Sequence, residues 1–302
     1  MNVAMSGSIS RRLFLAGTGG VLLAACGSSD GGSVTQDPSG ADASGAEGAA
    51  SSDGDDFALI RYFSDPSITA GLDRRLALGV ADIDGTLRPE GPAELRAGLL
   101  DDQGELIAEV VGTRRTESVA VPYYEFRLDV ADPAIYTLQV DLDGGRADAS
   151  FTVVESGTLP FAGPGDPLEQ FDTPTTSDGR GVDPICTREP GCPFHDVTLT
   201  EALAAAKPVV YLIGTPAFCQ TGTCGPILEL LMEVSDDFDD VTFVHSEVYT
   251  DTTATTPAPA VEASGLTFEP SIFLVGADGV VVERLDVVVD VSELRDRIAL
   301  IA

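Results

Sequence analysis

The chain has 302 residues, which is enough for two domains of modest size. It is strongly acidic, with 49 Asp and Glu residues against 17 Lys and Arg residues and a formal net charge of −32. Such a surface repels the phosphate backbone, so we expect no nucleic-acid partner. The acidity indicates a solvated shell that keeps the protein soluble, and by itself it identifies no partner.

Residues 1–25 have the features of an export signal. Residues 10–15 read SRRLFL, which fits the twin-arginine pattern, and the apolar stretch that follows is too short to span a bilayer. Residues 23–26 read LAAC and resemble the lipobox of bacterial lipoproteins, which implies cleavage before Cys26 and a lipid on its thiol. We therefore expect a lipid-anchored protein on the extracytoplasmic face of the cell membrane. A plain signal peptide or an uncleaved anchor is the alternative.

Two segments of different character follow the signal. Residues 26–56 are mostly Gly, Ser, Ala and Asp, so they have little apolar surface to bury and are expected to form a disordered tether. Residues 57–156 change to short alternating runs separated by turns, which predicts an all-β sandwich. Its final pattern, over residues 134–154, resembles the last two strands of immunoglobulin-like modules, and we interpret this domain as a spacer or docking module. The expected strands are Arg75–Val80, Ala93–Leu99, Glu105–Val111, Tyr123–Leu128, Ile135–Leu142 and Ala149–Val154.

Residues 157–195 are rich in Pro, Gly, Thr and Asp and are predicted to be a linker. This segment contains Cys186 and Cys192. Outside the cytoplasm, a pair that closes so short a loop is expected to be a structural disulfide. A second redox pair and a metal site with His195 are alternatives, although CxxxxxCxxH is not a recognised zinc spacing.

Residues 196–302 are predicted to form an α/β domain built around two cysteines. Val209–Ile213 has the apolar character of a buried strand, and Cys219 and Cys224 follow in a short loop. Two residues five apart on one helix face different directions, so the loop must be non-helical if the sulfurs are to bridge. The Gly225-Pro226 pair then starts a helix. Cys224 is thus expected near the helix N-terminus, where backbone amides stabilise a thiolate.

These residues resemble the thioredoxin superfamily, because an aromatic-Cys pair ends the strand region and Cys224-Gly225-Pro226 repeats the family's CGP. The CxxxxC spacing is wider than the usual CxxC and closer to the CxxxC of the TlpA/Sco-like branch. The resemblance implies a central mixed sheet flanked by helices. It also implies a cis-proline at Pro270 that faces the cysteines, with Phe218, Glu269 and Pro270 contacting substrate.

The function expected first is a thiol-disulfide oxidoreductase that acts on protein thiols and disulfides outside the cytoplasm through Cys219 and Cys224, without a cofactor. The helix dipole favours Cys224 as the thiolate, whereas position along the chain favours Cys219. Glu247 is an alternative proton acceptor for a buried thiol. A copper-binding module using Cys219, Cys224 and His245 is the second possibility, since thiolates favour Cu(I). A non-catalytic interaction lipoprotein with a structural disulfide is the third.

Overall fold

The computed structural model describes residues 57–119 and 121–302. The predicted export signal, the lipid-accepting Cys26 and the tether up to residue 56 lie outside the described residues. Within the part of the chain that is described, no helix is both long and apolar enough to cross a membrane.

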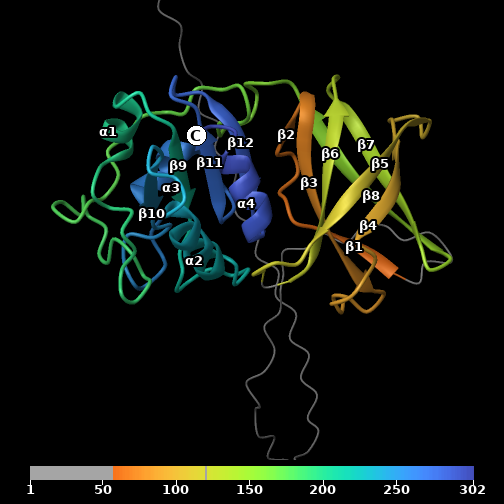
Figure 1. Ribbon diagram of the computed structural model, residues 1–302, viewed down its shortest axis with the longest axis horizontal. Coiled ribbons are helices and arrows are strands. Elements are labelled where there is room, and N and C mark those ends of the chain that lie inside the picture. The colour runs from red at the N-terminus through yellow and green to blue at the C-terminus, as the bar shows by residue number, and fades with distance from the viewer. Residues whose placement is uncertain (1–56, 120) are drawn as a thin grey trace, which may run out of the picture. The chain divides into compact units, whose positions relative to one another are not determined.

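Residues 57–154 form one eight-stranded sheet with the strand order β1-β3-β6-β5-β4-β7-β8-β2 (Figure 1). Neighbouring strands are antiparallel, except that β2 runs parallel to β8. The strands are β1 (Phe57–Arg61), β2 (Ile68–Thr69), β3 (Gly71–Asp82), β4 (Glu94–Leu100), β5 (Leu106–Arg115), β6 (Tyr123–Val130), β7 (Ala134–Leu142) and β8 (Gly145–Val154).

This sheet curls so that its first strand, β1, comes close to β8, the seventh strand in this order. The Arg61 guanidinium at the end of β1 donates a hydrogen bond of 2.8 Å to the carbonyl oxygen of Ser150 in β8. Side chains at alternate positions point into the curl and form one apolar core, as the period-two geometry of strands requires. The all-β character expected for this part of the chain is confirmed, although its strands form one curled sheet and not the two sheets of the predicted sandwich. The six predicted strands are present, and β1 and β2 are additional.

The second sheet has four strands in the order β10-β9-β11-β12. Strand β10 runs parallel to β9, and β11 is antiparallel to both β9 and β12. A mixed sheet is therefore confirmed. Its elements are α1 (Leu199–Ala204), β9 (Val209–Ile213), α2 (Cys224–Ser235), β10 (Thr242–Ser246), α3 (Pro259–Ser264), β11 (Ser271–Val275), β12 (Val281–Asp286) and α4 (Val291–Ile298).

Apolar cores cover both faces of the four-stranded sheet. On β9, Val210 and Leu212 pack into the core that contains α2 and α4, whereas Tyr211 and Ile213 pack into the core that contains α1. All five residues of β9 are buried, as predicted, because the strand has neighbours on both edges and apolar layers on both faces. The carboxyl end of this central strand is therefore held rigidly, and the cysteine loop begins there.

Residues 157–195 differ from the loose linker that was predicted. The segment has no helix or strand, yet Phe161 and Leu168 are buried in one core of the α/β unit, and Phe194 is buried in the other. The amide of His245 in β10 donates a hydrogen bond of 3.1 Å to the Phe194 carbonyl oxygen. The composition of the segment correctly predicted an irregular backbone. Its few aromatic and aliphatic residues, however, anchor it to the cores of the α/β unit.

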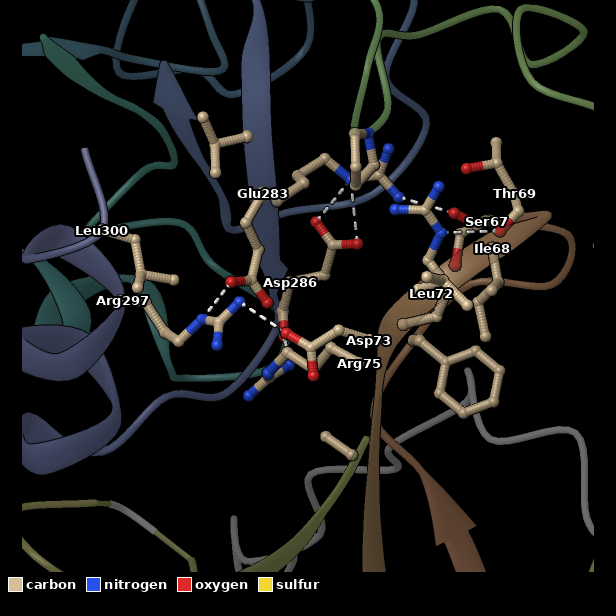
Figure 2. A pocket seen from close by; sticks show the side chains of 16 residues that line it. Ser67, Ile68, Thr69, Leu72, Asp73, Arg75, Glu283, Asp286, Arg297 and Leu300 are labelled. Carbon is tan, nitrogen blue, oxygen red and sulfur yellow. Dashed lines mark hydrogen bonds and ion pairs between the residues drawn. The ribbon is translucent and has the colours of Figure 1, made fainter. Parts of the chain in front are cut away.

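Charged side chains join β3 to β12 and α4. Arg297 in α4 bonds to the Glu283 carboxylate of β12 and, at 3.0 Å, to the Asp73 carboxylate of β3. Figure 2 shows these groups around a cleft, with Arg75 and Asp286 also on its wall. The cleft has a volume of about 280 Å³. The charges of the cleft are largely paired with one another, which indicates a structural role.

Candidate active site

The dithiol lies at the end of the central strand, where the loop after β9 enters α2. Cys219 and Cys224 form a disulfide with their Cα atoms 6.0 Å apart, within the normal range. Cys224 is the first residue of α2, so Gly225 and Pro226 occupy the first helical turn as predicted. The loop between the cysteines turns at Gly222, which has a φ of +69°, a conformation that glycine adopts without steric cost.

The two sulfurs differ in exposure. Cys219 is half-buried, whereas Cys224 is only 1% exposed. The backbone amide of Cys224 donates to Cys219 Sγ over 3.4 Å, and the Thr221 hydroxyl lies 3.1 Å from the same sulfur. The helix N-terminus therefore favours Cys219 as the thiolate. From the sequence, the same argument favoured Cys224. The first-turn amide of a helix stabilises the sulfur in front of it, and that sulfur belongs to the preceding loop.

Glu269 supplies a carboxylate beside the buried sulfur. Its Oε2 lies 3.3 Å from Cys224 Sγ and accepts a hydrogen bond of 2.9 Å from the Thr215 amide. Burial raises the pKa of Glu269 to about 7, and the Thr215 bond only partly opposes this effect. A carboxyl group with a pKa near neutrality is suited to exchange a proton with a thiol. The sequence predicted Glu269 as a substrate contact and did not predict that its carboxylate lies beside Cys224.

Close packing fixes the surroundings of Cys224. The Glu269–Pro270 peptide bond is cis, as predicted. A Cβ atom placed on Gly214 would lie 3.2 Å from Pro270 Cβ and 3.4 Å from Cys224 Sγ, so Gly214 allows both residues to approach the strand end. Phe218 is half-buried, with its ring edge-on to Tyr249 at 6.4 Å between centroids. It adjoins Cys219 in the chain and remains a candidate substrate contact.

The second cysteine pair does not form the predicted disulfide. Cys186 and Cys192 are both free and buried, and their sulfurs lie with the ring nitrogens of His195 and His245 within 4.8 Å of one another. Hydrogen bonds from Cys192, and then from the two histidines, lower the pKa of Cys186. The sequence grouped His195 with these cysteines only as an alternative metal site, and it assigned His245 to a copper site with Cys219 and Cys224.

The copper site suggested by the sequence is not assembled. Cys219 and Cys224 are grouped with Glu269, whereas His245 is grouped with Cys186, Cys192 and His195. His245 sits on β10 with its side chain held between the other cysteine pair and Gly214, which separates it from the dithiol loop. The three proposed copper ligands therefore do not converge on one position.

Glu247 does not replace Glu269 as the group beside the dithiol. It is buried, and its Oε1 accepts a hydrogen bond of 2.5 Å from the Thr187 amide. Its Oε2 has no hydrogen-bond partner among the described residues. Burial raises the pKa of Glu247. Its contact with Thr187 gives it a role in holding the segment that carries Cys186.

The titration of Glu269 predicts a pH-dependent stability effect. Its folded pKa of about 7 lies above the value of about 4.3 in an unfolded chain, so unfolding becomes easier as pH rises between these values. We expect Glu269→Gln, in the oxidised protein, to raise the free energy of unfolding by about 1–3 kcal/mol at pH 8 and to change it little at pH 4. Urea denaturation at both pH values measures this difference. Glu262→Gln, at an exposed position in α3, is the matched control, and an equal effect of both variants would contradict the burial of Glu269.

Neither a protein-family model nor a curated protein matches this chain. The assignment of function therefore depends on the geometry of the site.

Proposed function

We propose that this protein is a thiol-disulfide oxidoreductase whose reactive group is the Cys219/Cys224 couple. One observation carries the proposal: the partly buried Cys219 is bridged to the buried Cys224 at a helix N-terminus, and a carboxyl group lies 3.3 Å from Cys224 Sγ. These are the three parts that dithiol exchange needs, namely an accessible nucleophile, a resolving thiol and a proton acceptor. A disulfide that served only as a staple would not require the carboxyl group.

In the reducing direction, the Cys219 thiolate attacks one sulfur of a substrate disulfide. A mixed disulfide forms, and the other substrate sulfur leaves as a thiolate. The Cys224 thiol then passes its proton to Glu269 and attacks Cys219 Sγ, which releases the second substrate thiolate and forms the Cys219–Cys224 disulfide. The substrate gains two electrons and the protein dithiol loses them. The same steps in reverse oxidise a substrate dithiol.

We further propose that residues 196–302 adopt a thioredoxin-like fold. The strand order β10-β9-β11-β12, the parallel β9-α2-β10 unit and the cis-Pro270 beside Cys224 support this assignment. The curled sheet of residues 57–154 is proposed to be an immunoglobulin-like spacer.

The proposed location is the extracytoplasmic face of the cell membrane. The SRRLFL and LAAC patterns support export by the twin-arginine route and a lipid on Cys26. Protein thiols and disulfides on that face are the proposed substrates, because an anchored domain reaches partners at the same surface.

A redox titration tests this function. The purified protein is equilibrated in glutathione buffers of increasing oxidised fraction, free thiols are alkylated, and peptides are mapped by mass spectrometry. We expect Cys219 and Cys224 to pass together, and reversibly, between dithiol and disulfide, and we expect the reduced protein to reduce insulin. A Cys219→Ser, Cys224→Ser double variant should show neither effect. A bridge that stays closed in every buffer, or insulin reduction equal to that of the double variant, would rule out the proposal.

A further inference from the structure

Four buried side chains outside the dithiol converge on one point. Cys186, Cys192 and His195 come from the irregular segment before α1, and His245 comes from β10. Each offers one ligand atom, and these atoms all lie within 4.8 Å of one another. All four residues are buried, with His245 at 0% exposure, so this is a closed arrangement and not a surface cluster.

The distances agree with those of ligands around one tetrahedral ion. Zinc bonds of about 2.3 Å to sulfur and about 2.0–2.1 Å to nitrogen place a sulfur and a nitrogen ligand about 3.6 Å apart, and two nitrogen ligands about 3.4 Å apart. Cys192 Sγ lies 3.5 Å from His245 Nδ1, and His245 Nδ1 lies 3.2 Å from His195 Nε2.

The outer hydrogen bond of His245 prepares it to act as a ligand. His245 Nε2 lies 2.9 Å from the carbonyl oxygen of Gly214, which can only accept a hydrogen bond. The proton of a neutral His245 must therefore be on Nε2, and Nδ1 presents its lone pair to the centre of the group. Metal-binding histidines are commonly oriented by such a bond from the other ring nitrogen.

We propose that Cys186, Cys192, His195 and His245 bind one Zn²⁺ ion in a structural Cys₂His₂ site. Two thiolates and two imidazoles form a ligand set that selects zinc in tetrahedral geometry. Four protein ligands leave no open position for substrate. Two thiolate charges balance the charge of the ion, which makes its burial in an apolar core acceptable.

The zinc site would hold the segment that supports the dithiol loop. Next to Cys186, the Thr187 hydroxyl accepts a hydrogen bond of 3.0 Å from the Ala217 amide, two residues before Cys219. Arg188 makes a two-point ion pair with Glu229 of α2, at 2.6 and 3.1 Å. The ion would thus link this segment to β10 through His245, whereas the expected Cys186–Cys192 disulfide would have closed a loop within the segment alone.

Metal analysis of the purified full chain tests the proposal. We expect about one equivalent of zinc per chain after extensive dialysis, and X-ray absorption should show two sulfur and two nitrogen ligands at about 2.3 and 2.0–2.1 Å. The Cys219→Ser, Cys224→Ser double variant should keep the full equivalent. This control separates the zinc site from the proposed redox activity, because loss of either one leaves the other measurable.

Variants at two of the four positions test the ligand assignment. Cys186→Ser and His195→Ala should lower zinc content at least fivefold, whereas His195→Cys, which retains a ligand atom, should keep most of it. Zinc release from the unmodified protein by a thiol-specific mercurial provides a test that does not depend on the folding of any variant. The proposal is overturned if the purified protein binds no added zinc, if it has a Cys186–Cys192 disulfide in the mass spectrum, if copper fills the site in place of zinc, or if Cys186→Ser retains the full equivalent.

Discussion

Replacing Cys219 with serine is expected to reduce disulfide exchange by about 10³-fold or more, because the hydroxyl of serine does not replace a thiolate nucleophile. Cys219 is the less buried residue of the pair, and its Sγ accepts a hydrogen bond of 3.4 Å from the Cys224 amide. Reduction of insulin by the reduced variant, followed by turbidity, measures the loss. The fold of the reduced protein should be unaffected, since the Cys219–Cys224 bridge is already open in that state.

Cys224→Ser is the matched partner of this experiment and should fail at a different step. It retains the Cys219 nucleophile but lacks the resolving thiol, so it should accumulate a mixed disulfide with substrate that mass spectrometry detects. Cys219→Ser should form no such adduct. If the adduct instead accumulated in Cys219→Ser, Cys224 would be the attacking residue and the assignment of roles would be reversed.

Replacing Glu293 with alanine is expected to lower the free energy of unfolding by about 3–5 kcal/mol, the usual cost of leaving a buried charge unpaired. Glu293 in α4 is 0% exposed. Its carboxylate makes a two-point ion pair with Arg75 of β3, at 2.6 and 2.9 Å, and accepts a hydrogen bond from Tyr123 of β6. Without the carboxylate, Arg75 keeps its charge in a buried position.

The Glu293 carboxylate should stabilise the protein less as pH falls, whereas Glu269 lowers the stability as pH rises. Burial alone would raise the pKa of Glu293, but the charge of Arg75 and its hydrogen bonds lower it to about 2. Its stabilisation is therefore fully present above the unfolded value of about 4.3, and it is lost as pH falls from there towards 2.

Urea denaturation of Glu293→Ala at pH 7 and pH 3 measures both effects, and the deficit should shrink at the lower pH. Glu233→Ala, which removes an exposed ion pair with Arg295, is the control and should cost less than about 1 kcal/mol. Equal losses in the two variants would show that the network around Glu293 contributes no more than a surface pair.

Local signals predicted the elements of the α/β part of the chain well. The buried strand Val209–Ile213 has the predicted bounds, and the Gly225-Pro226 pair lies in the first turn of α2, as predicted. Each of these depends on residues close in sequence. The two-residue β2 was missed because so short a strand shows no alternation, and the burial of Phe161 was missed because it depends on a partner far along the chain.

The site was predicted in part for the same reason. The pairing of Cys219 with Cys224 and the cis-proline at Pro270 could be inferred from the motif. The contact between the Glu269 carboxylate and Cys224 Sγ could not, because the motif places the backbone at Pro270 near the cysteines but does not give the direction of the preceding side chain. The Cys186 and His245 cluster was missed likewise, since the fourth ligand lies on a distant strand.

Timed alkylation of the reduced, folded protein tests the central claim most directly. A limiting amount of N-ethylmaleimide is added at pH 7, and peptide mapping gives the extent of labelling at Cys219 and Cys224 over time. The difference in burial and the Cys224 amide bond predict labelling of Cys219 at least about tenfold faster than labelling of Cys224. Faster labelling of Cys224, or two sulfurs that react only after denaturation, would contradict the proposed chemistry.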